Sequence, residues 1–202
     1  MTSDLERRMR LVWDRQEIER VLYTYCRAID RLDVELLRSV YHPDAIDAHG
    51  SFEGNAHEFA EFIVDRIRRQ TTCGFHTVTN PLIEVDGDRA ICESSYVGYH
   101  RVPGGWEAVS AFFGDAYATK ARQEGTLDQE HEYLCGGRYL DRFERRAGVW
   151  RIWRRQITNE WNQCRPSTHL LDGGRKHYDL PGARDRTDPV YDLKLDWSLT
   201  AS

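Results

Sequence analysis

The sequence predicts an α+β fold in which helices come first and a curved antiparallel sheet closes over them. Apolar residues recur every three or four positions over residues 5–29 and again over 59–67, as in amphipathic helices. From residue 75 onward the period changes to two, as in strands. Helices segregated before an antiparallel sheet are typical of the α+β class. We expect a cone-shaped sheet with an apolar interior, which would form a natural pocket.

The first helix has an identifiable start and end. Ser3 and Glu6 stand at the spacing of a capping box, in which each side chain accepts a hydrogen bond from the other residue's backbone. Apolar side chains then recur at steps of three and four as far as Ile29, which predicts a long amphipathic helix. Asp30 consequently lies at the end of this helix, facing the sheet.

Two further helices are predicted before the long strands. Asp33 is placed to cap a short helix, which should end at His42-Pro43 because the residue before a proline avoids helical dihedral angles. A short strand follows over residues 45–52. Asn55 then caps a third helix. The apolar face of this helix carries Phe59, Phe62, Ile63 and Ile67.

Two hairpins form the predicted sheet. The first joins strands over residues 75–85 and 89–102 through an Asp-Gly-Asp turn, and Asp-Gly is a strong hairpin signal. The second joins strands over residues 132–145 and 149–161 through Arg-Ala-Gly. Both hairpins come after all three helices, so the sheet is expected to be mainly antiparallel.

Residues 1–161 are predicted to form one domain, with an insertion at about residues 103–131 and an extension over residues 162–202. The insertion begins with Pro-Gly-Gly and includes a helix around residues 108–123. The extension is expected to be irregular chain that packs on the body or on a neighbouring subunit, because it keeps apolar anchors that a linker would lack. These anchors are Leu170, Leu171, Tyr178, Leu180, Tyr191, Leu193, Leu195 and Trp197.

Composition excludes several classes of protein. The 202 residues carry 28 Lys and Arg against 33 Asp and Glu, a formal charge of −5, so no positive field draws the chain to nucleic acid. No apolar run approaches the ~20 residues that span a bilayer, and the N-terminus alternates charges where a secretion signal is apolar. Five scattered cysteines without a CxxC pair fit reduced thiols. We expect a cytoplasmic protein.

Motifs for metals, cofactors and nucleic acids are missing from the sequence. His57-Glu58 and His131-Glu132 each lack the second histidine of a zinc-binding helix, and the chain has no GxGxxG, GxxxxGK[ST] or GxSxG. Tryptophan and arginine alternate over residues 150–155, which indicates an amphipathic strand with a solvated arginine face rather than a platform for single-stranded nucleic acid. We therefore expect neither a metal nor a cofactor.

Three strings in the sequence carry a resemblance to a known family. They are the run Tyr-Cys-Arg-Ala-Ile-Asp-Arg-Leu-Asp at residues 25–33, Phe-His-Thr at residues 75–77, and Gly-Gly-Arg-Tyr-Leu-Asp-Arg-Phe-Glu-Arg at residues 136–145. Over about residues 8–161 the chain resembles the SnoaL-like branch of the NTF2-like superfamily. Within that branch it is most similar to lyases of the bile acid 7α-dehydratase, hexachlorocyclohexane dehydrochlorinase and scytalone dehydratase types, which need no cofactor and are trimeric.

The resemblance implies a set of site residues. Asp30 and His76 match the Asp-His dyad of these lyases, and Tyr25 stands one helical turn before the aspartate, as in the bile acid enzyme. Arg138 matches an arginine that the dehydratase and the dehydrochlorinase share. His100, on the second strand, falls near a second histidine of scytalone dehydratase. The insertion and the long extension depart from the family pattern, which leaves the substrate open.

The chemistry of these side chains is consistent with an elimination. Histidine, with a pKa near 6.5, is the side chain best suited to remove a weakly acidic proton at neutral pH, so His76 is the candidate base. Asp30 on its other ring nitrogen would fix the tautomer and stabilise the imidazolium. Tyr25 would hydrogen-bond a carbonyl that becomes an enolate, and Arg138 would take up negative charge on oxygen or on the leaving group.

The sequence thus predicts a lyase that eliminates water or a comparable group from a hydrophobic, ring-containing small molecule. His100, Tyr96 and Tyr41 complete the set as expected substrate contacts. An isomerase or a polyketide cyclase on the same cone is the alternative among enzymes, because it uses the same proton abstraction. A non-catalytic binding module is the alternative outside them, and it predicts no buried contact between histidine and carboxylate. A homo-oligomer is expected, a trimer rather than a dimer.

Overall fold

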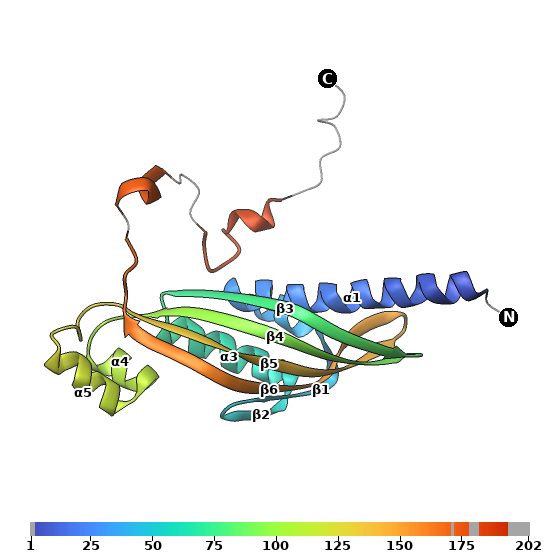
Figure 1. Ribbon diagram of the computed structural model, residues 1–202, viewed down its shortest axis with the longest axis horizontal. Coiled ribbons are helices and arrows are strands. Elements are labelled where there is room, and N and C mark those ends of the chain that lie inside the picture. Colours follow the sequence, from blue (N-terminus) through green and yellow to red (C-terminus); the bar gives the residue numbers. More distant parts are fainter. Residues whose placement is uncertain (1–2, 171, 178–181, 194–202) are drawn as a thin grey trace, which may run out of the picture.

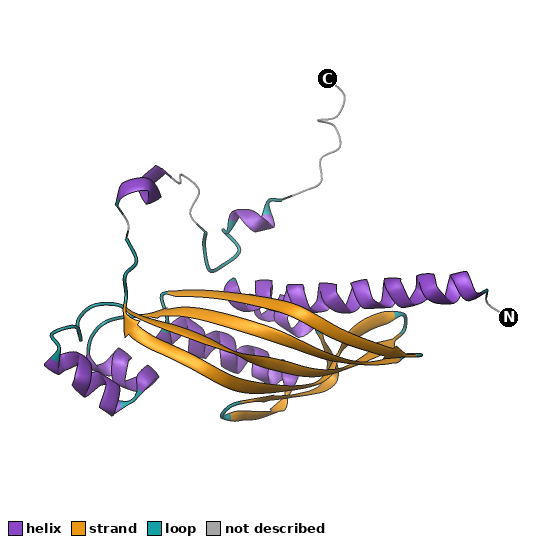
Figure 2. Ribbon diagram, in the orientation of Figure 1, coloured by secondary structure: helices purple, strands orange, loops and turns teal. Residues whose placement is uncertain are grey.

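A curved sheet of six strands forms the centre of the molecule, in the order β2-β1-β6-β5-β4-β3 (Figures 1 and 2). The computed structural model describes residues 3–170, 172–177 and 182–193. Neighbouring strands are antiparallel except for β1 and β6, which run parallel, so the sheet is mixed. The strands are β1 (Tyr41–His49), β2 (Phe52–Asn55), β3 (Cys73–Asp86), β4 (Arg89–Val102), β5 (His131–Arg146) and β6 (Val149–Pro166).

Helix α1 (Asp4–Asp30) confirms the predicted first helix, including its end at Asp30. Both hydrogen bonds of the capping box between Ser3 and Glu6 are present, which explains where the helix begins. Its second half is buried through residues such as Ile18 and Leu22, whereas its first turns extend past the end of the sheet (Figure 1). The apolar side chains of those turns are exposed, namely Leu5, Met9, Val12 and Trp13.

The second and third predicted helices are also present, and each is capped as the sequence indicates. Asp33 caps α2 (Val34–Ser39) by accepting from the backbone of Leu36 at 3.1 Å, and Asn55 caps α3 (Ala56–Gln70). Helices α1 and α3 cover the inner face of the sheet, and their apolar residues form one core with that face. Among the helices of the described residues, none combines the length and the apolar character that crossing a membrane requires.

Both predicted hairpins are confirmed, but the single strand expected over residues 45–52 is wrong. In its place β1 and β2 form a small hairpin whose turn includes Gly50, with a φ of 65° that glycine adopts without strain. Strand β1 also begins earlier than expected, at Tyr41, because it pairs in parallel with β6. Such a long-range pairing leaves no local signal in the sequence.

The insertion contains two helices instead of the single one expected over residues 108–123. Helix α4 (Trp106–Phe113) and helix α5 (Asp115–Gln123) are separated by Gly114, whose φ is 90°. A positive φ interrupts an α-helix, and glycine is the residue that takes it at little cost. Together the two helices stand at the end of the sheet where β4 ends and β5 begins (Figure 1).

The extension starts later than predicted, because β6 continues to Pro166. Residues 182–193 then pack where α1 meets α2. The buried carboxylate of Asp188 forms an ion pair with Arg31 at 2.9 Å, and the Tyr191 hydroxyl donates to Asp33 at 2.9 Å. Leu170 and Leu193 are exposed and anchor nothing in the described chain. The anchors expected at Leu171, Tyr178, Leu180, Leu195 and Trp197 lie outside the described residues.

Candidate active site

A cavity of about 320 Å³ opens between the inner face of the sheet and helices α1, α3 and α4. Its walls are mostly aromatic and aliphatic, with Tyr96, Tyr133 and Tyr139 from the sheet and Phe112 from α4. Isoleucines from α1, α3 and β6 complete the apolar surface. A mostly apolar hollow with a few polar side chains is the usual form of a small-molecule site.

His76 and Asp30 meet at one wall of this cavity. The Nδ1 atom of His76 lies 2.7 Å from Asp30 Oδ1, and the backbone N–H of His76 donates to Asp30 Oδ2 at 3.1 Å. The two side chains are only 12% and 9% exposed. Because a carboxylate accepts at Nδ1, we assign the proton of the neutral ring to that nitrogen, which leaves Nε2 as the unprotonated, basic atom.

Gly98 makes room for the His76 ring. It lies opposite His76 in the pairing of β3 with β4, and a Cβ atom there would stand 3.3 Å from His76 Cδ2 and 3.4 Å from Nε2. That Cβ would also stand 3.3 Å from the Cys135 sulfur. The space beside Gly98 is therefore bounded by the His76 ring on one side and by the Cys135 side chain on the other. The His76 imidazole is thus held by its carboxylate partner and by close packing on a strand backbone.

His100 lies beside the dyad on the same wall. Its ring meets the His76 ring edge to face, with centroids 5.0 Å apart. Burial lowers the pKa of His100 well below its usual value, and the nearby charges of His76 and Arg184 lower it further. The ring is therefore neutral at pH 7, and its Nδ1 atom has no hydrogen-bond partner among the described residues.

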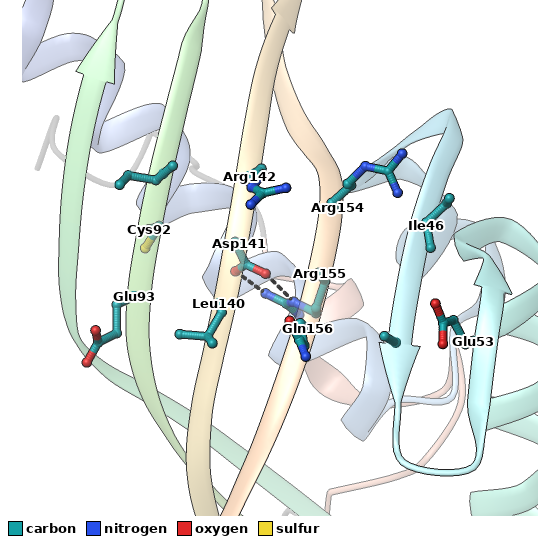
Figure 3. A pocket seen from close by; sticks show the side chains of 12 residues that line it. Ile46, Glu53, Cys92, Glu93, Leu140, Asp141, Arg142, Arg154, Arg155 and Gln156 are labelled. Atoms are coloured by element: carbon teal, nitrogen blue, oxygen red, sulfur yellow. Dashed lines mark hydrogen bonds and ion pairs between the residues drawn. The ribbon is translucent and has the colours of Figure 1, made fainter.

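Tyr25 forms the back of the cavity and is fully buried. The Arg155 guanidinium lies 4.1 Å from the centroids of the Tyr25 and Tyr139 rings, and it makes two hydrogen bonds of 2.7 Å to Asp141 (Figure 3). Burial raises the pKa of Tyr25 above its ordinary value, so its hydroxyl stays protonated. That hydroxyl has no partner among the described residues and is available as a donor.

Two of the expected site residues do not line the cavity. Arg138 lies on the outer face of β5, where its guanidinium pairs with Glu93 and Glu160. Strand alternation explains this correction, because Tyr139, the next residue, occupies the inner face. Tyr41 is buried behind the cavity wall, where its hydroxyl donates to Asp47 at 2.5 Å.

The remaining predicted contact, Tyr96, does line the cavity, with its hydroxyl donating to the Thr158 carbonyl at 3.2 Å. Sequence reasoning missed other cavity residues, including Tyr133, Asn159 and the His49 side chain. Alternation along β5 from Tyr139 back through Cys135 places Tyr133 on the inner face, so this signal was present in the sequence. On β6 the bulge opposite Gly136 and Gly137 shifts the pairing next to Asn159.

No group of three or more metal-binding side chains occurs within the part of the chain that the structure describes. A second hollow, of about 500 Å³, lies across β1, β4, β5 and β6, and Asp141 and Arg155 are among the residues that line it (Figure 3). No histidine lines it, and its rim carries charged side chains from several strands. The hollow with the His76–Asp30 pair is therefore the candidate active site.

Comparison with known proteins agrees with this fold. The sequence model of the SnoaL-like domain matches residues 10–156. No protein of curated function is significantly similar to the chain in sequence. Among solved structures, hexachlorocyclohexane dehydrochlorinase LinA-type3 from Novosphingobium barchaimii LL02 superposes with a TM-score of 0.62 at 19% identity, covering 85% of this chain and 100% of that one.

Two further structures are similar to a comparable degree. A candidate scytalone dehydratase from Novosphingobium aromaticivorans DSM 12444 has a TM-score of 0.58 at 16% identity, covering 75% of this chain and 87% of that one. The Kfla4162 protein from Kribbella flavida has a TM-score of 0.58 at 19% identity, covering 76% and 95%. At sequence identities of 16–19%, these similarities show a shared fold and nothing more.

Proposed function

The chain belongs to the SnoaL-like domain family, and from this premise we propose that it is a cofactor-independent lyase acting on a hydrophobic, ring-containing small molecule. One observation carries the proposal: a buried imidazole held by a carboxylate at 2.7 Å on the wall of an apolar cavity. Solved lyases of the dehydrochlorinase type share the fold, which supports the reaction class. The reaction is the elimination of water or of a comparable leaving group.

His76 acts as the base in this proposal. Its Nε2 atom takes a proton from a carbon next to a carbonyl, and the electron pair of the C–H bond moves toward the carbonyl oxygen. Asp30 holds the ring through Nδ1 and stabilises the imidazolium that forms. Acid-base catalysis of this kind contributes about 10² to 10⁴ in rate, so it needs help from groups that stabilise the enolate.

Tyr25 supplies that help. Its buried hydroxyl stays protonated and has no partner among the described residues, so it can donate to the oxygen on which negative charge develops. The C–O bond of the leaving hydroxyl then breaks, and the proton held on His76 Nε2 passes to the departing oxygen. Water leaves, a C=C bond remains, and the base returns to its neutral form.

An isomerase or cyclase on the same site is the second candidate among enzymes. It begins with the same proton abstraction but returns the proton to another carbon and expels nothing. The product mass separates the two, because only elimination lowers it by one water. The buried contact between His76 and Asp30 argues against a purely binding role, which requires no such pair.

The first prediction tests the dyad. We expect His76→Ala to lower turnover by about 10² to 10⁴, because the base is removed, and Asp30→Asn to lower it through loss of the correct tautomer and orientation. The assay uses a panel of cyclic β-hydroxyketones with one to four rings and follows product mass and enone absorbance. His177→Ala, at an exposed histidine, is the matched control. Full activity of the folded His76→Ala variant would refute the role of the dyad.

A further inference from the structure

The charge of the cavity wall differs in sign from that of the whole chain. The protein has a formal charge of −5, yet no aspartate or glutamate lines the cavity, whereas Arg66 does, beside three histidines that count as neutral. The two nearest buried carboxylates stand behind the wall, Asp30 behind His76 and Asp47 behind His49. A hollow lined by one sign of charge attracts a ligand of the opposite sign.

Arg66 is placed at the rim of the cavity, between α3 and the turn that joins β1 to β2. Its Nε atom donates to Gln70 Oε1 at 3.2 Å, and its Nη1 atom contacts Ser51 Oγ at 3.5 Å. Both Arg66 and Gly50 line the cavity and are exposed, so they mark its mouth. The dyad, by contrast, is almost completely buried.

Arg66 and Gln70 keep N–H groups that donate no hydrogen bond in these contacts. No carboxylate of the described chain lies within ion-pairing distance of Arg66, although Arg69 on the same helix pairs with Asp65. The Gln70 amide accepts from Arg66 through its oxygen, so its NH₂ group remains free to donate. The Nη2 atom of Arg66 has no partner among the described residues.

Arg184, a further arginine near the cavity, does not line it and is held by other contacts. Its guanidinium donates to the Thr71 carbonyl at 2.6 Å and to the Thr71 hydroxyl at 2.9 Å, so both terminal nitrogens are committed to the end of α3. It adds positive charge near the dyad, and its two terminal nitrogens hold the extension to the end of α3. Its Nε atom is buried and has no partner among the described residues.

We propose that Arg66 and Gln70 bind a carboxylate on the substrate, so that the substrate is a ring-containing acid whose rings enter the apolar cavity first. This inference rests on the proposed function and names the substrate class for that site. A guanidinium matches a carboxylate in shape and offers two parallel N–H donors. The acid group stays in water at the mouth, and the rings contact the aromatic wall near His76.

Binding measured without turnover tests this inference. The probes are phenylacetate, 2-naphthylacetate and a four-ring steroid carboxylate, each compared with its own neutral primary amide by isothermal titration calorimetry at low salt. For the probe that fits the cavity, we expect the acid to bind about tenfold more tightly than the amide, because one charge-assisted contact is lost in the amide. Arg66→Gln should reduce this preference to about threefold or less, and Arg66→Lys should give an intermediate value because the lysine keeps charge without the fork.

Arg69→Gln is the matched control, since it removes the same charge from the same helix at a residue outside the cavity. It should leave the preference for the acid unchanged. The inference is overturned if no acid of the series binds more tightly than its amide, or if the Arg66 and Arg69 variants behave alike. His76→Ala should retain the preference, so a failure of the proposed catalysis and a failure of the anion site give different results.

Discussion

Gly98 shows how one absent side chain positions the candidate base. Strand alternation places Gly98 on the inner face of β4, in register with His76 on β3. Any larger residue would push against the imidazole and against Cys135, which pack on either side of it. The position therefore determines where the Nε2 atom stands in the cavity.

We predict that Gly98→Ala displaces the His76 ring. The added Cβ requires shifts of a few tenths of an ångström in a closely packed wall, at a cost of about 1–3 kcal/mol in the free energy of unfolding. Turnover should fall about tenfold to a hundredfold, because misplacing a catalytic group is costly. Urea denaturation and the dehydration assay check both effects. Gly54→Ala, where the new Cβ meets only the tip of the Phe52 ring, is the control, and an equal loss of activity there would contradict the explanation.

His100 leads to a prediction about pH. Its pKa is lowered in the folded protein, mainly by burial and further by the charges of His76 and Arg184, while the unfolded chain keeps the ordinary value near 6.5. Below about pH 6.5 the unfolded state therefore binds a proton that the folded state does not, and stability falls as pH falls. The slope contributed by this residue approaches about 1.4 kcal/mol per pH unit.

Urea denaturation at several pH values between about pH 7 and pH 5.5 measures this slope, since carboxylates titrate mostly below that window. His42, whose pKa is also lowered by burial, adds to the wild-type slope. His100→Gln should reduce the slope by up to one proton even if the variant is less stable overall. An unchanged slope in that variant would show that His100 is not the group responsible.

At the level of single residues, the family's motifs predicted more of the site than local sequence patterns could. The dyad residues and Tyr25 were found through their similarity to the family's motifs, because the contact between residues 30 and 76 leaves no local pattern. Arg138 fell outside the cavity because a motif gives a position in the chain and not the face of the strand. Tyr41, which no motif supported, is buried behind the cavity wall. The alternation of β5 from Tyr139 to Tyr133 was readable, whereas the bulge in β6 opposite Gly136 has no local signal.

Among the elements, a completely buried ion pair joins β5 to β6 and packs against α1. The side chains of Asp141 and Arg155 are completely buried, and the guanidinium lies between the rings of Tyr25 and Tyr139. The pair thus connects two strands with the helix that ends at Asp30. Both charges have lost their hydration, so each depends on the other.

We predict that Asp141→Asn lowers the free energy of unfolding by about 3–5 kcal/mol, because it leaves the Arg155 charge buried without its counter-ion. The double variant Asp141→Leu with Arg155→Met should recover a large part of that loss, since apolar residues of similar volume can replace a buried pair. Urea denaturation of both variants measures their free energies of unfolding relative to the wild type. A single variant within about 1 kcal/mol of the wild type would mean that the pair is not desolvated in solution.

Element boundaries were predictable where the signal is local. Capping residues fixed the starts of α1, α2 and α3, and turn glycines fixed both long hairpins. The break at Gly114 and the small β1–β2 hairpin were missed, because a glycine in a polar stretch is compatible with a helix, a loop or a turn until its φ is known. The parallel pairing of β1 with β6 depends on tertiary contacts that no local window contains.

For the whole molecule, the outer face of the sheet has features of an interface. Ile91, Val97 and Leu140 stand 53%, 38% and 39% exposed on neighbouring strands. Around the hollow in that face lie charged side chains of both signs, among them Glu53 and Arg154 (Figure 3). A patch that combines exposed apolar residues with both charges can contact a different surface of a second copy, as the head-to-tail interfaces of a trimer require.

The outer face of the sheet is the surface through which we expect the protein to assemble. We expect the protein to form a homo-oligomer, a trimer by resemblance to the lyases, and a stable interface of this kind buries about 1,200–2,000 Å² in total. Placing a charge at its centre by Ile91→Glu together with Leu140→Glu should dissociate it, because an unpaired charge desolvated in an apolar contact costs several kcal/mol. Light scattering coupled to size-exclusion chromatography gives the mass directly. Val149→Glu, at an exposed apolar residue that begins β6 beside the β5–β6 turn, should leave the oligomer intact. A wild-type protein that elutes as a monomer at micromolar concentration, or a double variant of unchanged mass, would show that the outer face serves no assembly.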